Sequence, residues 1–240
     1  MGEEGAPVTA RRMAWCTIFL TAVIVAGAAT AEEDPDAPKW REQCPGFSEW
    51  EQQRQPDPAA QSPLTTARNP KLKARILRMR DEDQQARAAM TGDMAKLTRA
   101  QISKVNAIDR RNLKTIKVIL TQYGTPTPDS ISEDGVGAFW ILVQHADSDP
   151  ALQERVLHDF QDHPSGVRRQ DIALLIDRVR VNQHRPQVYG SQFHSVGKVF
   201  AAHEIEDPEN VDERRKAMNL PSMALYKCML HVAYEGAVIE

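Results

Sequence analysis

The sequence predicts a mainly α-helical protein, with a single helical domain and one small β-hairpin, preceded by a signal peptide and a Pro-rich linker. From about residue 71 onward, apolar residues recur at spacings of three and four, the period of helices with one buried face. Between residues 186 and 206 the pattern changes to an alternation of period two, which is typical of strands. Seven of the fifteen prolines fall in residues 32–70, where no apolar period is sustained, so this segment is predicted to be extended and flexible.

Composition places the 240-residue chain among soluble globular proteins, because 41% of its residues are hydrophobic and 26% are charged. Lys and Arg number 30 against 33 Asp and Glu, so the formal net charge of −3 provides no basic excess for binding nucleic acid. Three cysteines are too few for a fold built on a disulfide framework. We expect no nucleic-acid partner, and either a small polar ligand or an unidentified protein partner.

The N-terminus has the pattern of an export signal, predicted to span residues 1–31. Arg11 and Arg12 precede an apolar run over residues 16–28, and residues 29–31 (Ala-Thr-Ala) offer a small-x-small cleavage site. The run is shorter than the roughly 20 residues needed to span a bilayer. We therefore expect cleavage, no membrane span in the mature chain, and a periplasmic or secreted location. Retention of the segment as an anchor is the alternative.

Two cysteines, Cys44 and Cys228, would remain after cleavage of the signal. An oxidising compartment would permit a disulfide between them, which would tie both ends of the mature chain together. Such a bond would contribute about 4–5 kcal/mol by loop entropy. The sequence allows either this disulfide or two free, buried thiols.

The predicted helices are marked by apolar spacing and by residues that begin or end helices. Gly92 ends the first helix, Asp93 is the expected N-cap of the second, and Gly124 ends the second. Asp149 followed by Pro150 is typical of an N-cap and a first helical position. The domain is predicted to occupy residues 71–240, with helices at about 71–90, 93–122, 136–146, 150–162, 168–183, 208–218 and 221–235 and the hairpin within 186–206.

The helix over 136–146 has a feature of its own. Residues 138–143 (Ala-Phe-Trp-Ile-Leu-Val) are apolar on every face of a helix, which predicts a central, buried element. This helix ends in the polar cluster Gln144-His145-Ala146-Asp147. The sequence therefore delivers polar side chains at the end of its most buried helix.

Polar residues also fall on or beside the apolar stripes of two further helices and at the start of the hairpin. A buried polar group without a partner costs about 1–3 kcal/mol, so these residues are expected to contact one another or a ligand. We predict that they converge on one hydrophilic site. The candidates are Asp109, Asn112, Gln144, His145, Asp147, Asp177, Arg178, Gln187, Tyr189 and Gln192.

These residue types suit acid–base chemistry on a small ligand. We predict that His145 is the general base and that the carboxylate of Asp109 or Asp177 orients it, which makes these three the candidate catalytic residues. The alternatives are a core histidine satisfied by a neighbouring group and, for Asp147, a helix cap. A guanidinium, carboxamides and a hydroxyl can hold an anionic or amide-bearing ligand. The predicted ligand-binding residues are Asn112, Gln144, Asp147, Arg178, Gln187, Tyr189 and Gln192.

No motif in the sequence indicates a metal, a cofactor or a covalent nucleophile. His145 and Asp147 would lie on nearly opposite sides of a helix, and neither His-x-x-x-His nor His-Glu-x-x-His occurs. The chain also has no Gly-x-Ser-x-Gly elbow, no Gly-rich phosphate loop and no dinucleotide fingerprint. We therefore expect neither a metal nor a cofactor.

Five short motifs form an ordered set along residues 80–195. They are Asp83-x-x-x-Arg87, Asp109-x-x-Asn112, Gln144-His145-Ala146-Asp147, Asp177-Arg178-Val179 and Gln187-Val188-Tyr189-Gly190-Ser191-Gln192. In this set the chain resembles a bacterial helical family catalogued as a domain of unknown function, number 6624. It departs from that family in having Thr125 and Ser191 where Trp and Thr are frequent. The resemblance implies a shared fold and polar site, and it implies no particular activity.

Two functions remain open at the level of sequence. The first is an exported helical domain whose polar pocket binds or hydrolyses a small polar or anionic ligand. The second is a non-enzymatic envelope module, for binding or structure, whose buried polar network only stabilises the fold. Solvent access separates the two, because the first requires polar residues around a concave opening and the second predicts that apolar side chains seal them.

Overall fold

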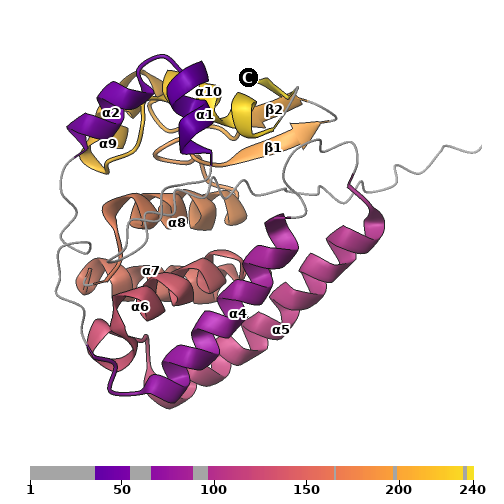
Figure 1. Ribbon diagram of the computed structural model, residues 1–240, viewed down its shortest axis with the longest axis vertical. Helices are drawn as coiled ribbons and strands as arrows, with labels where there is room; N and C mark the ends of the chain where they lie inside the picture. The colour runs from indigo at the N-terminus through magenta and orange to yellow at the C-terminus, as the bar shows by residue number, and fades with distance from the viewer. Residues whose placement is uncertain (1–35, 55–65, 89–96, 165, 197–198, 235–236) are drawn as a thin grey trace, which may run out of the picture.

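The structure is a computed structural model that describes residues 36–54, 66–88, 97–164, 166–196, 199–234 and 237–240. It confirms the predicted fold class, because the described chain is mainly helical and contains a small β-sheet in its C-terminal part (Figure 1). The predicted signal peptide, residues 1–31, lies outside the described residues. None of the described helices combines the length and the apolar character needed to cross a bilayer.

Two long helices, α4 and α5, pack side by side along one edge of the molecule (Figure 1). α4 spans Pro70–Ala88, and the Asn69 side chain accepts a hydrogen bond from the Leu72 backbone N–H (3.0 Å) in its first turn. α5 spans Arg99–Tyr123 and begins with a capping box formed by Thr98 and Gln101. The second predicted helix is therefore capped at Thr98 and not at Asp93, which lies outside the described residues.

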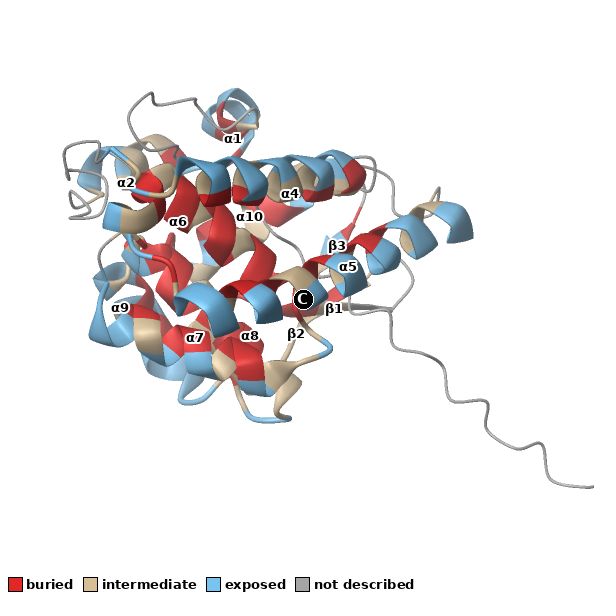
Figure 2. Ribbon diagram, turned by 90° about the horizontal axis from the view of Figure 1, so that it is seen from below, coloured by how far each residue is buried: buried red, intermediate tan, exposed pale blue. Residues whose placement is uncertain are grey.

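Three helices, α6 (Pro128–Gln144), α7 (Pro150–Asp162) and α8 (Arg169–Asn182), complete the main helical layer. α6 is the buried central helix that the apolar run predicts, and it packs along α4. It begins at Pro128 rather than near residue 136, with a break at Ser132, whose φ of 61° departs from helical geometry. The predicted N-cap of α7 is confirmed, since Asp149 accepts a hydrogen bond from the Leu152 N–H (3.1 Å). Figure 2 shows that the buried faces of α4 to α8 turn toward one another around the main core.

The hairpin is confirmed, and the structure adds a third strand to it. β1 (Phe193–Val196) and β2 (Val199–Ala202) pair antiparallel, with Phe193 opposite Ala202. β3 (Val238–Ile239) pairs parallel to β2, and with two residues it is too short to show a period in the sequence. A short 3-10 helix η2 (Pro208–Asn210) and α9 (Val211–Ala217) follow the hairpin, and α10 (Met223–Ala233) packs on the sheet.

Part of the Pro-rich lead-in is helical, which corrects the prediction of an extended segment. α1 (Ala37–Gln43) and α2 (Phe47–Gln53) lie close to α10 (Figure 1). Trp40 and Phe47 are buried there, and a disulfide joins Cys44 to Cys228. Two seven-residue helices are too short for an apolar period, and contacts with the distant end of the chain hold them in place. Of the two alternatives for the cysteines, the structure has the disulfide.

Candidate functional site

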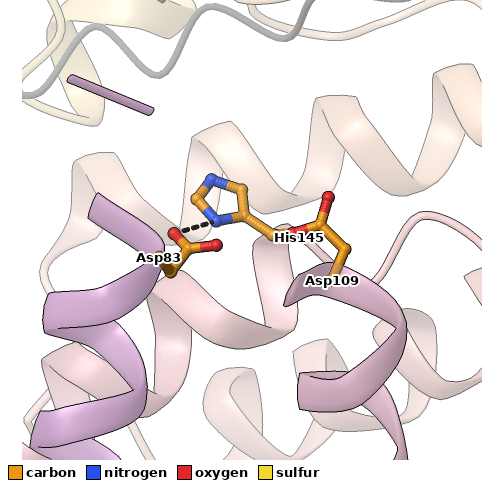
Figure 3. Close-up of side chains that lie close together, drawn as sticks. All are labelled: Asp83, Asp109 and His145. Atoms are coloured by element: carbon orange, nitrogen blue, oxygen red, sulfur yellow. Dashed lines mark hydrogen bonds and ion pairs between the residues drawn. The ribbon is translucent and has the colours of Figure 1, made fainter. Parts of the chain in front are cut away.

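A buried histidine–carboxylate pair lies where α4 meets the end of α6. His145 is the residue that ends α6, and its Nδ1 lies 2.8 Å from Oδ2 of Asp83 on α4 (Figure 3). The side chains are only 2% and 1% exposed, respectively. The close packing of α4 against α6 brings these residues together across 62 positions of sequence. The residue that holds His145 is therefore Asp83, and neither Asp109 nor Asp177 takes that role in the structure.

Arg87 links this pair to Asp109 on α5. It lies one turn beyond Asp83 on α4, and its Nε is 3.3 Å from both oxygens of the Asp83 carboxylate. Its Nη2 donates to Oδ1 of Asp109 at 2.6 Å. The side chains of Arg87 and Asp109 are 18% and 24% exposed, so this edge of the network is its more accessible side.

Burial sets the protonation of this network at neutral pH. Burial lowers the pKa of His145 to about 4, and the Arg87 charge adds to this effect in spite of the Asp83 carboxylate. Burial acts to raise the pKa of Asp83, but His145 and Arg87 together hold it below its ordinary value. An ionised carboxylate only accepts hydrogen bonds, so Nδ1 of the neutral imidazole donates to Asp83 and Nε2 keeps a lone pair.

Asp109 titrates in a different range from Asp83. Burial raises its pKa to about 6 despite the ion pair with Arg87, and the negative charges of Asp83 and Asp147 contribute to the rise. Two carboxyl groups that contact one arginine thus differ in proton affinity. Such a difference is the arrangement that lets one group act as an acid while another stays ionised.

A second ion pair lies beside His145. Arg178 on α8 is 1% exposed and binds Asp147 through two hydrogen bonds, Nε to Oδ1 at 2.7 Å and Nη2 to Oδ2 at 2.6 Å. The Asn182 amide donates to Oδ1 of Asp147 (3.1 Å) and to Oε1 of Gln153 (3.0 Å). Asp147 is therefore an ion-pair partner of Arg178, and the alternative prediction of Asp147 as a helix cap is wrong, because Asp149 caps α7.

Several polar atoms close to these pairs are buried without a hydrogen-bond partner among the described residues. They are Nε2 of His145, both side-chain polar atoms of Asn112 and Oε1 of Gln144. Asn112 lies one turn beyond Asp109 on α5, and Gln144 directly precedes His145. A buried polar group that lacks a partner costs about 1–3 kcal/mol. This set of atoms is thus poorly explained by a network that only stabilises the fold.

Asp83, Asp109 and His145 also have the residue types and spacing of a cation site. Each offers a ligand atom, and these atoms lie within 4.8 Å of one another (Figure 3). Arg87, however, contacts both carboxylates and supplies the positive charge that a cation would otherwise bring. A metal would have to displace this guanidinium, so the geometry favours a site for acid–base chemistry over a metal centre.

The other predicted residues gather in a second network, around the segment 187–192 at the start of the hairpin. Oδ1 of Asp177 accepts hydrogen bonds from the backbone N–H groups of Val188 (2.7 Å) and Tyr189 (2.9 Å), and Oδ2 accepts one from Ser191 (2.9 Å). Burial raises the pKa of Asp177 in spite of these bonds. Asp177 therefore anchors a loop, and the prediction that it orients His145 is wrong.

Gln187 and Gln192 brace the same segment. The Gln187 amide donates to the carbonyl groups of Gln192 (3.0 Å) and His203 (2.8 Å) and accepts from the Gln192 N–H (2.8 Å). The carbonyl oxygen of Tyr189 accepts a hydrogen bond from Arg215 at 2.5 Å. The predicted convergence of all ten residues on one site is thus only partly observed, because these residues shape the hairpin connection.

Asp83 and Arg87 belong to the first of the five motifs shared with the family, but they were not among the ten predicted site residues. A signal for Asp83 was present, because it continues the spacing of Leu72, Ile76 and Met79 on α4 and so falls on the buried stripe. Arg87 follows at the i+4 position, where it can pair with Asp83 on the same face. A carboxylate on an apolar stripe with a cation one turn later was the pattern to find.

The fold and the site together define a small helical domain built around a buried carboxylate–histidine–arginine network. The chain belongs to a family of unknown function, DUF6624, whose sequence profile matches residues 70–239. This confirms the resemblance seen over residues 80–195 and extends it through the hairpin and the last helices. No curated protein matches the chain. No solved structure matches it either.

Proposed function

We propose that the chain is an exported protein whose Asp83–His145 network binds a small polar or anionic ligand and hydrolyses it with His145 as general base. The observation that carries this proposal is the state of the imidazole. Asp83 holds Nδ1, and Nε2 is buried without a partner among the described residues. A neutral imidazole in this tautomer has a lone pair ready to take a proton.

The chemistry follows from the side chains of this network. Nε2 would accept a proton from a water molecule as its oxygen bonds to the ligand's carbonyl or phosphoryl centre, and Asp83 would stabilise the resulting imidazolium. Asp109, with a pKa of about 6, would give a proton to the leaving group under mildly acidic conditions. The partly exposed side chains of Arg87 and Asp109 mark the side from which a ligand would enter.

A network that serves only the fold is the second candidate. The 2% and 1% exposure of the His145 and Asp83 side chains favours it, because a reacting group must be reached by its substrate. The unpartnered atoms of Asn112, Gln144 and His145 favour the ligand-binding function instead. A purely structural network would gain stability from satisfying these atoms.

Thermal-shift measurements separate these two functions. Inorganic phosphate, succinate and glutamine represent anionic and amide-bearing ligands. Hydrolysis is measured separately with p-nitrophenyl acetate and p-nitrophenyl phosphate. We expect at least one of these compounds to raise the melting temperature of the wild-type protein. His145→Ala should abolish that rise, beside the loss of stability that removal of a 2% exposed ring causes by itself. His158→Ala is the matched control, because His158 is an exposed histidine on α7.

The outcome that would favour the structural function is equally concrete. In that case no compound raises the melting temperature of the wild-type protein and the protein hydrolyses none of them. His145→Ala then changes stability alone, lowering the melting temperature by several degrees while His158→Ala does not. Loss of a buried hydrogen bond and the cavity left by the ring would produce such a decrease.

Export is the part of the proposal that the disulfide supports. A bond between Cys44 and Cys228 is stable in oxidising compartments and rare in the cytosol. Expression of the full chain in a bacterial host should yield a secreted or periplasmic product that begins at Glu32. N-terminal sequencing checks this, and an intact Met1 in a cytosolic product would contradict it.

A further inference from the structure

The charge of the chain is unevenly distributed, with a strong positive excess on α4 and α5. The two helices together carry twelve Lys and Arg residues against four Asp and Glu residues, a formal charge of +8. The whole chain has a formal charge of −3, so the remainder of the sequence is acidic. The overall composition therefore does not show the positive character of this helix pair.

Most of these cations are exposed and form no ion pair with a described residue. Five of the twelve contact carboxylates, as Arg87 does with Asp83 and Asp109. The other seven are exposed, and within the described part of the chain they have no acidic partner. They are Lys71, Arg75 and Arg78 on α4 and Arg99, Lys104, Arg110 and Lys114 on α5.

The cations of the two helices lie on one continuous surface. The three on α4 are spaced by four and then three residues, which places them on one face of the helix, and Glu82 continues that face by another turn. Glu82 pairs with Arg111 of α5, which neighbours Arg110 and lies one turn before Lys114. The outer face of α4 therefore borders the cationic part of α5, and Figure 2 shows both helices with exposed outer faces.

Few free carboxylates oppose this positive surface. Asp81 and Glu82 are the exposed acidic residues of the two helices, and each pairs with an arginine in the same region of the surface. The carboxylates that border the surface from the α6 and α7 side are also paired with cations. They are Asp129, Asp134 and Asp149. The net charge that the surface presents to a partner is therefore positive.

An exposed apolar side chain lies among these cations. α4 and α5 run antiparallel (Figure 1), and the Glu82–Arg111 ion pair fixes which residues lie level with one another. Val118, which is 44% exposed, lies two turns beyond that pair on α5, level with Arg75 on α4. Tyr123, 57% exposed, ends the same helix. Basic side chains beside exposed aliphatic and tyrosine side chains are typical of proteins that bind the interface of an anionic bilayer.

We propose that this outer α4–α5 face binds the surface of a bilayer that contains anionic phospholipid. Its Lys and Arg side chains lie against the lipid phosphate groups, and Val118 lies at the boundary with the acyl chains. A nucleic acid would meet the same cations but would give Val118 no apolar contact. The choice of lipid over nucleic acid also rests on the export proposed above. The binding is independent of the chemistry proposed for His145.

Vesicle flotation measures this binding. The full oxidised chain is mixed with vesicles of phosphatidylcholine alone, or with vesicles in which phosphatidylglycerol replaces a third of that lipid. We expect stronger binding to the anionic vesicles. Raising sodium chloride from about 0.1 M to about 1 M should weaken it, because the screening length falls from about 10 Å to about 3 Å.

A matched pair of double variants locates the binding surface. Arg75→Ala with Arg78→Ala should weaken binding to the anionic vesicles about 25-fold, because each basic residue near the lipid contributes about fivefold. Arg185→Ala with Lys216→Ala removes two exposed cations outside the helix pair and should bind like the wild type. The predicted signal segment is present in every protein compared, so a difference between variants reports the α4–α5 face.

A fluorescent label at position 118 shows whether this face meets the bilayer. Val118→Cys carries a dansyl group, and Cys16→Ser leaves it as the single free thiol beside the Cys44–Cys228 disulfide. Anionic vesicles should shift the dansyl emission to shorter wavelength. The same label in Glu213→Cys, an exposed position on α9, should show no shift.

Three results would overturn the proposal. They are equal binding to neutral and anionic vesicles, equal binding by the wild type and the Arg75→Ala, Arg78→Ala variant, and an unchanged emission at position 118. Binding to duplex DNA without binding to vesicles would also contradict it and would assign the face to a nucleic acid. Far-ultraviolet circular dichroism of each variant ensures that folded proteins are compared.

Discussion

Replacement of Asn112 by leucine should stabilise the protein, because both polar atoms of the Asn112 side chain are buried without a partner among the described residues. Leucine has a similar shape and carries no group that loses hydration on folding. Removal of the unsatisfied amide is worth about 1–3 kcal/mol, and slight overpacking offsets part of that gain. We expect a net increase of about 1–2 kcal/mol in the free energy of unfolding, measured by urea denaturation of the oxidised protein. The melting temperature should rise by about 2–8 °C.

Asn182→Leu is the matched control for this substitution. The Asn182 amide donates to Asp147 and to Gln153, so its loss should lower the free energy of unfolding by about 1–2 kcal/mol. If Asn112→Leu is instead as destabilising as Asn182→Leu, the Asn112 amide has a hydrogen-bond partner in the folded protein. Asn112 would then offer no free polar group to a ligand beside His145.

Three further predictions concern the covalent and ionic links of the fold. The double substitution Cys44→Ser and Cys228→Ser should lower the free energy of unfolding by about 5 kcal/mol, because the disulfide closes a loop across a separation of 184 residues. Urea denaturation measures the change, and a loss under about 1 kcal/mol would contradict the prediction. Arg178→Met should lower the free energy of unfolding by about 3–5 kcal/mol in the same assay, because it leaves Asp147 without the 1% exposed guanidinium that pairs with it. An unchanged free energy of unfolding would contradict this prediction. Asp109→Asn should steepen the loss of stability between pH 6.5 and 4 by up to about 3 kcal/mol. The pKa of His145 is about 4 in the folded protein against an ordinary 6.5, so the contribution of His145 to stability is lost as the pH falls through this window. The pKa of Asp109 is about 6 in the folded protein against an ordinary 3.8, so its contribution grows as the pH falls and offsets that loss in the wild type. An unchanged slope in urea titrations at several pH values would contradict this assignment.

The helical layer was predictable because its signals are local. The apolar stretch 138–143 required a buried helix whatever its neighbours, and Asp149-Pro150 began α7 where the sequence placed it. The boundaries that differ depend on side-chain chemistry or backbone geometry. Thr98 and Gln101 form a capping box at the start of α5, and the break at Ser132 joins two helical segments into α6.

The composition of the site was harder to predict because it depends on how helices pack. The spacing of α5 and α6 placed Asp109 and His145 on inward faces, but it did not show which carboxylate would hold the imidazole. Asp83 takes that role because α4 packs along α6. Asp177 follows the same period and instead anchors the 188–191 backbone, since a helix face specifies burial and not the identity of the partner.

The helices of residues 37–53 were not predicted from the sequence, because contacts with distant residues determine them. Residues 37–53 form two short helices because Trp40 and Phe47 pack on α10 and because Cys44 is bonded to Cys228. Each of these contacts spans most of the chain. Local composition, which is rich in proline, predicted the opposite.

The state of the His145 imidazole tests most directly whether Asp83 holds it as a neutral base, and nuclear magnetic resonance of ¹⁵N-histidine-labelled protein measures that state. Long-range ¹H–¹⁵N correlations distinguish the two tautomers, and a pH titration gives the pKa. We expect a proton on Nδ1, a lone pair on Nε2 between pH 5 and pH 8, and a pKa of about 4 for His145. A proton on Nε2, or a pKa close to the ordinary value of 6.5, would contradict the claim that Asp83 holds His145 as a neutral base.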